Sequence, residues 1–265
     1  MGQNSRIEWT HHTFNPWWGC ARVSAACKNC YADTWARRLG LDLWKPGAER
    51  RFFSDEHWRQ PIRWNEEAVK KGIRRRVFCA SMADVFEARS DLDALRDRLW
   101  ATVRATPSLD WLLLTKRPHL IEELWPWGKQ SPANVWLGTT AENQRWAEKR
   151  IPILLEFSGP IRFLSCEPLL GPIDLSPWIL SVAGTPRIDW VIAGGESGAR
   201  ARPMKPEWVK LLRDQCEKED AAFFFKQWGA HGSDGKRRSK KANGRTYQGT
   251  IWDLVPLASA DHLQS

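Results

Sequence analysis

The chain has 265 residues, 42% of them apolar and 27% charged, and its formal net charge is +9. Such a composition is typical of a globular protein with one large domain or two small ones. No apolar run is long enough to span a bilayer, and residues 1–12 lack an apolar signal core, so we expect a cytoplasmic protein without membrane contact. The positive charge, although spread along the chain, favours an anionic partner such as a nucleic acid or a nucleotide.

Short apolar runs that end in small or polar residues predict strands, with helical patterns between them. A continuous apolar run is typical of a strand that is covered on both faces, as in a parallel sheet. We predict seven strands, at residues 13–18, 76–80, 111–115, 135–138, 162–164, 190–193 and 222–225. Helices are predicted at residues 31–39, 90–106, 141–157 and 206–219. Ser90 and Asp93 form a predicted capping box, and Pro152 is expected to end or kink its helix.

Strands that alternate with helices at this spacing indicate βαβ units and the α/β class. We predict one (β/α) barrel, partial or near-complete, over residues 1–255. An open doubly wound sheet is the alternative. Residues 229–249 are rich in Gly, Lys, Arg and Ser and predict a mobile basic loop, which is either a solvated surface or a phosphate-contacting clamp. Residues 256–265 are predicted to form a tail.

Three cysteines, Cys20, Cys27 and Cys30, fall within eleven residues, and two of them have Cys-x-x-Cys spacing. One loop with this spacing can wrap a soft metal centre with several thiolates. Tetrahedral zinc needs four ligands, and a second Cys-x-x-Cys pair is absent, which leaves His11 and His12 as weak candidates for the fourth. Three thiolates on a four-iron cluster leave one iron open for a cofactor or substrate. Structural zinc and three unrelated thiols are the alternatives.

Polar residues follow the predicted strands, at the end of the barrel where sites form. Glu167 and Glu196 come directly after apolar strands and need positively charged partners, for which Lys116, Arg117 and Lys226 are the candidates. A buried salt-bridge network that closes the barrel is the structural alternative. Further polar or small residues at strand ends are Ser81, Asp84, Thr139, Glu142, Asn143, Gly194 and Gly195.

The cysteine loop resembles that of radical S-adenosylmethionine (radical SAM) enzymes, and its Cys-x-x-Cys-Tyr ending at Tyr31 is similar to the spore photoproduct lyase branch. A closer resemblance covers nearly the whole chain and is to the phage-associated three-Cys-motif proteins, a radical-SAM-like family. Besides the cysteine loop, the matching segments are residues 7–10, 81–86, 113–118, 136–139, 142–144, 167–171, 194–198 and 225–229. The spacing departs from the wider radical SAM pattern, because six residues instead of three separate the first two cysteines.

This resemblance implies a 4Fe-4S cluster on Cys20, Cys27 and Cys30, with S-adenosylmethionine at the open iron. An electron donor would reduce the cluster, and cleavage of S-adenosylmethionine would yield a 5′-deoxyadenosyl radical that abstracts hydrogen from the substrate. Under this hypothesis Lys116, Glu167 and Glu196 are assigned as catalytic. The residues assigned to cofactor binding are Ser81, Asp84, Thr139, Glu142, Asn143, Gly194 and Gly195.

Two other functions stay open at this point. The first is a nucleic-acid-binding phage or prophage protein in which zinc or a cluster serves only the structure, without catalysis. It would bind DNA or RNA with a steep salt dependence. The second is a protein that keeps the cluster without S-adenosylmethionine, either as a redox sensor or as an enzyme of another type.

Overall fold

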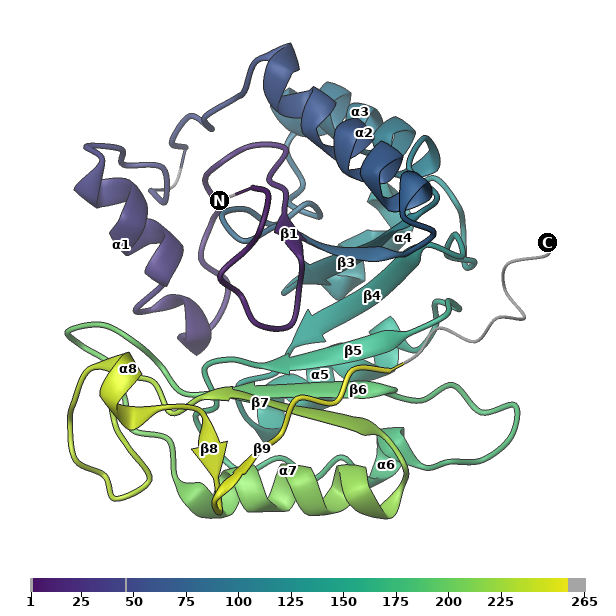
Figure 1. The fold of residues 1–265 in the computed structure, drawn as a ribbon. Coiled ribbons are helices and arrows are strands. Elements are labelled where there is room, and N and C mark those ends of the chain that lie inside the picture. Colours follow the sequence, from purple (N-terminus) through teal and green to yellow (C-terminus); the bar gives the residue numbers. More distant parts are fainter. Residues whose placement is uncertain (1, 46, 257–265) are drawn as a thin grey trace.

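The computed structural model describes residues 2–45 and 47–256, and its centre is a curled sheet of parallel strands (Figure 1). The sheet has seven strands in the order β1 to β7, each paired in parallel with the next. This order confirms the predicted α/β barrel in its partial form. The strands are β1 His12–Thr13, β2 Arg75–Cys79, β3 Leu109–Thr115, β4 Val135–Thr140, β5 Arg162–Cys166, β6 Trp190–Gly194 and β7 Ala222–Gln227.

Helices cover the outer face of the sheet: α2 packs on β2 and β3, α5 on β4, and α7 on β6 and β7. Helix α2 was not predicted, and its interior contains Pro61. Helix α5 continues past Pro152 to Leu154, and α3 begins without a side-chain cap, so the capping box was wrong. The helices are α1 Tyr31–Arg38, α2 Asp55–Lys70, α3 Asp93–Arg104, α4 Ile121–Leu124, α5 Gln144–Leu154, α6 Ser176–Ile179, α7 Pro206–Lys218 and α8 Lys240–Asn243.

Alternation along the strands divides the core into two parts. Val77 of β2 faces the helices, whereas its neighbour Phe78 faces the interior of the barrel. The interior is aromatic, and Trp9 from the N-terminal segment lies in it, 4.5 Å from the Phe78 ring centre and 6.0 Å from that of Trp190. Full burial of each such side chain contributes about 1.5–3 kcal/mol. The interior of the barrel is therefore a packed core.

The chain beyond β7 runs back along the sheet. The Phe225 amide donates to the Trp252 carbonyl at 2.8 Å, and Trp190 Nε1 donates to the Leu254 carbonyl at 3.0 Å. The first bond, with the bridge between Phe224 and Asp253, pairs backbone groups of β7 that would otherwise stay exposed at the edge of the sheet. No helix within residues 2–45 and 47–256 has the length and apolar character needed to cross a membrane.

The predicted basic loop, residues 229–249, has short elements of its own. It contains α8 and β8 Thr246–Tyr247, and β8 pairs with β9 Thr250–Ile251 in an antiparallel hairpin. Ser239 caps α8 by accepting a hydrogen bond from the Ala242 amide at 3.1 Å. The mobility of this loop stays a prediction. Of the predicted tail, residues 257–265 lie outside the described residues.

Candidate functional site

A cavity of about 410 Å³ lies at the carboxyl ends of the strands, beside α1 and the cysteine loop. All three clustered cysteines line it. Six more of the residues predicted for the site do so too, and these are Ser81, Asp84, Lys116, Glu167, Gly195 and Glu196. Thr139, Glu142, Asn143 and Gly194 are not in its wall. Topology thus brings together residues that are up to 176 positions apart, from Cys20 to Glu196.

The three thiols offer soft donors to this cavity. Burial, and then the nearby Asp84 carboxylate, raise the pKa of the Cys20 thiol to about 12. Burial raises the pKa of Cys30 as well, although the Lys116 ammonium partly offsets it. In the described residues no three His, Cys, Asp or Glu side chains are spaced to hold a metal ion. The donor set fits an iron–sulfur cluster chemically, but binding requires the sulfurs to converge and to lose their protons.

Three charged side chains form hydrogen bonds with the backbone of the cysteine loop. The Ala21 amide donates to Glu87 Oε1 at 3.1 Å, and Arg117 Nη2 donates to the Ala21 carbonyl at 2.7 Å. The Ala26 amide donates to Glu142 Oε1 at 3.0 Å. Glu142, predicted to bind a cofactor, therefore supports the loop from outside the cavity wall. These bonds fix the loop's backbone while the cysteine side chains face the cavity.

Glu196 also supports the loop, and its partner differs from the predicted one. Arg202 Nη2 donates to Glu196 Oε1 at 2.6 Å, and Asn29 Nδ2 donates to Oε2 at 3.0 Å. The predicted partners Lys116, Arg117 and Lys226 do not pair with it, because the segment after β6 places Arg202 closer. Burial raises the pKa of Glu196, but the hydrogen bonds from Arg202 and Asn29 outweigh burial and hold its pKa below the usual value.

Glu167 has the predicted partner. Lys226 Nζ lies 2.7 Å from Glu167 Oε1, and both side chains line the cavity. A Cβ added at Gly194 would lie 2.8 Å from the same oxygen, so glycine at this position leaves room for the carboxylate. Lys116 lines the cavity too, and within the described chain its ammonium has no carboxylate partner. The described part of the wall thus offers the neutralised pair of Glu167 and Lys226, and a Lys116 ammonium without an ion-pair partner.

Arg117, named in the sequence only as an ion-pair candidate, links the cysteine loop to the sheet. Its Nη1 lies 2.8 Å from Asp84 Oδ2 and 3.6 Å from Cys20 Sγ. Asp84 also accepts from the Thr115 hydroxyl at 2.7 Å and from the Lys116 amide at 3.1 Å. Asp84 therefore has partners for both of its oxygens and acts through Arg117. The signal for this role was the polar segment that follows β3.

Three predicted residues make contacts within the fold. Thr139 donates to the Thr115 carbonyl at 2.9 Å, and Asn143 caps α5 through the Trp146 amide at 3.3 Å. A Cβ added at Gly195 would lie 1.9 Å from the Trp228 carbonyl oxygen, so this glycine permits close contact between two backbone segments. The partners of these three residues are set by the fold, and their residue types alone do not identify them.

Residues 4–256 match the family described as "Protein of unknown function (DUF5131)". The chain belongs to this family. None of the curated proteins matches it. Solved structures of spore photoproduct lyase are similar to it in fold, among them a mutant with bound AdoMet and dinucleoside spore photoproduct, at 14% identity, TM-score 0.45, 86% coverage of this chain and 59% of that one. A second mutant aligns at 11% identity and TM-score 0.46 and covers 82% of this chain and 64% of its own. The chain thus spans about three fifths of those proteins.

His11 and His12, considered above as a fourth ligand, line a different cavity of about 430 Å³ together with Glu67, Lys71 and Arg75. His11 Nδ1 accepts a hydrogen bond from the Arg76 amide at 2.9 Å, which requires a neutral acceptor nitrogen. Burial and then neighbouring arginines lower the pKa of both rings to about 4. The two histidines of this DUF5131 protein therefore belong to the edge of β1 and not to the cysteine loop.

This burial predicts a loss of stability in mild acid. Unfolded histidine takes up a proton near pH 6.5, whereas the folded rings resist protonation until about pH 4. Stability is therefore complete above pH 6.5 and falls as the pH drops from 6.5 to 4. Urea unfolding at about pH 7 and pH 5 measures this, and a His11→Gln, His12→Gln double variant should show a smaller fall. An equal fall in the free energy of unfolding for both proteins would contradict the conclusion that burial of the two histidines causes this pH dependence.

Proposed function

We propose that this chain is an iron–sulfur enzyme of the radical SAM type that modifies a nucleic acid or a nucleotide. The observation that carries this proposal is that three cysteines of one loop line a single cavity at the ends of parallel strands. The described part of the cavity wall contains no fourth cysteine and no histidine, which favours an open centre over a closed zinc site. The segments that resemble the phage-associated three-Cys-motif proteins support the same assignment.

Cys20, Cys27 and Cys30 would hold the 4Fe-4S cluster. When bound, such a cluster supplies the electron, delivered by an external donor, that cleaves S-adenosylmethionine. Lys116, a cation of the wall without an ion-pair partner among the described residues, is suited to bind the carboxylate of S-adenosylmethionine. Trp9 and Phe78 give the cavity an apolar floor that suits a flat heterocycle and excludes water.

Glu167 and Lys226 would orient the polar groups of the cofactor or substrate, since each still has hydrogen-bonding capacity toward the cavity. Glu142, Glu196 and Arg117 are positioning residues, because their contacts are to the cysteine loop. This division of roles replaces the sequence assignment of Glu196 as catalytic.

Anaerobic purification of the wild-type protein, followed by iron and sulfide analysis, tests the proposal. We expect about four iron atoms per chain, and 5′-deoxyadenosine after addition of a reductant and S-adenosylmethionine. A protein that takes up zinc but no iron would contradict the proposal in favour of a structural metal. An iron-loaded protein that never cleaves S-adenosylmethionine would refute the radical SAM assignment.

A further inference from the structure

Helix α1 buries small side chains and exposes large apolar ones, whereas most helices on a protein surface do the reverse. Its small residues Ala32 and Ala36 are buried against Met82 and Trp44. Its large apolar residues are exposed instead: Tyr31, Trp35 and the following Leu39 are 53%, 44% and 50% exposed. These three positions are spaced by four residues and form one row, which we call the α1 stripe. Exposed aromatic side chains in one row are unusual on a protein that has no partner.

The stripe continues into the candidate active-site cavity. Tyr31 belongs to both, because its ring lines the cavity and its hydroxyl donates to the Ser81 carbonyl at 2.6 Å. Cys30 directly precedes the helix, so a ligand on the stripe lies next to the cysteine loop. Figure 1 shows α1 at the edge of the molecule, with its outer side free of other elements. Because Tyr31 lines the cavity and Trp35 lies one helical turn farther along, a ligand on the stripe lies beside the cavity.

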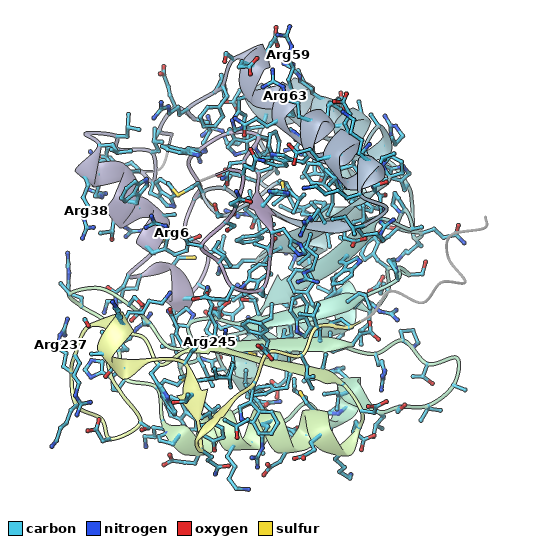
Figure 2. All side chains as sticks on the ribbon, viewed as in Figure 1. Arg6, Arg38, Arg59, Arg63, Arg237 and Arg245 are labelled. Atoms are coloured by element: carbon cyan, nitrogen blue, oxygen red, sulfur yellow. The ribbon has the colours of Figure 1, made fainter. Side chains whose placement is uncertain are left out.

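The charge around the stripe is positive. Asp33 is the one acidic residue of α1, and it is buried and paired with Arg22 and Arg37. Arg38 is exposed and, among the described residues, has no acidic partner; the same holds for Arg6, which lines the cavity (Figure 2). Flat aromatic faces beside unpaired guanidinium groups suit a polyanion with stackable bases.

We infer that the α1 stripe binds unpaired nucleotides of a single-stranded nucleic acid and directs one of them into the cavity, an inference that rests on the proposed function. Trp35 and Tyr31 would stack on bases, and Arg38 and Arg6 would contact phosphates. A duplex keeps its bases paired and stacked on one another, so only an unpaired strand can present single bases to the aromatic faces of the stripe. An acidic protein would match the charge but would not require flat aromatic faces.

Fluorescence anisotropy of labelled DNA and RNA strands of about 12 nucleotides tests this inference. We expect Trp35→Ala to weaken binding of at least one of the two strands about tenfold, Trp35→Phe to restore most of it, and Arg38→Gln to reduce its salt dependence. The matched controls are Leu180→Ala, an exposed apolar residue beyond α6, and Arg63→Gln on α2 (Figure 2). Neither control should change the affinity.

Equal affinities for wild type and Trp35→Ala, or no binding of either strand at low salt, would overturn the inference. A duplex bound as tightly as the single strand would overturn it as well. Iron content and S-adenosylmethionine cleavage, measured on the same anaerobic samples, keep the two proposals apart. Strand binding that depends on Trp35, without cleavage of S-adenosylmethionine, would refute the proposed enzymatic activity but support nucleic-acid binding by the α1 stripe. Cleavage of S-adenosylmethionine without strand binding would support the enzymatic activity and refute nucleic-acid binding by the α1 stripe.

Discussion

Replacement of Cys30 by alanine is expected to abolish iron retention in this protein. Cys30 is one of only three thiols that line the cavity within the described residues, so its loss leaves two protein ligands. Two thiolates do not hold a 4Fe-4S cluster that already lacks a fourth protein ligand. Iron and sulfide analysis after anaerobic reconstitution measures the effect, together with the visible absorbance of the cluster. Cys20→Ala and Cys27→Ala should behave in the same way.

The matched control is Cys216→Ala. Cys216 is buried on α7, outside the cavity wall, and its thiol packs in the core between the sheet and the helices. We expect this variant to bind as much iron as the wild type, with a small loss of stability from the missing sulfur. If Cys30→Ala retained its iron, or if Cys30→Ala and Cys216→Ala lost equal amounts of iron, the proposed cluster on Cys20, Cys27 and Cys30 would be contradicted.

Replacement of Arg117 by glutamine is expected to lower the free energy of unfolding by about 3–5 kcal/mol. The Arg117 and Asp84 side chains are only 6% and 7% exposed, so the change leaves a carboxylate buried without its counter-charge. It also removes the donor to the Ala21 carbonyl, which frees part of the cysteine loop. Urea or guanidinium unfolding of the two proteins measures the difference.

An exposed ion pair gives the control. Arg63 lies 2.6 Å from Glu56, and both side chains are 58% exposed, so Arg63→Gln should change stability by less than about 1 kcal/mol. The Asp84→Leu, Arg117→Leu double variant should recover part of the stability that Arg117→Gln loses, because it leaves no buried charge unpaired. Similar effects of Arg117→Gln and Arg63→Gln would show that the buried pair does not stabilise the fold.

The local sequence was sufficient to predict the positions of the longer strands and to identify the candidate cysteine ligands. Each of the six longer strands was predicted to within a few residues, because a parallel sheet buried on both faces requires continuous apolar runs. The first was placed too late, since β1 is the two-residue pair His12–Thr13 and residues 14–18 make other contacts. The cysteine spacing is likewise a local property, so Cys20, Cys27 and Cys30 stood out before any fold was known.

Proline was a poor guide to helix ends in this chain. Pro61 lies inside α2, and Pro152 lies inside α5, because helix packing against the sheet stabilises each helix beyond the cost of a missing backbone hydrogen bond. A local pattern carries no information about that packing energy. For the same reason α2, whose buried face includes Trp58, Trp64 and Ala68, escaped prediction.

The sequence by itself determined which residues are polar at the strand ends, but only the tertiary structure decided what each one contacts. Glu167 forms the predicted ion pair with Lys226, whereas Glu196 pairs with Arg202. Glu142 accepts a hydrogen bond from the Ala26 amide. Residues that neighbour each other in sequence point in different directions at the end of a strand, and their partners come from loops far along the chain. Side-chain type is therefore read from the sequence, while the choice between binding a ligand and holding the cysteine loop is set by distances of a few ångströms that only the fold defines.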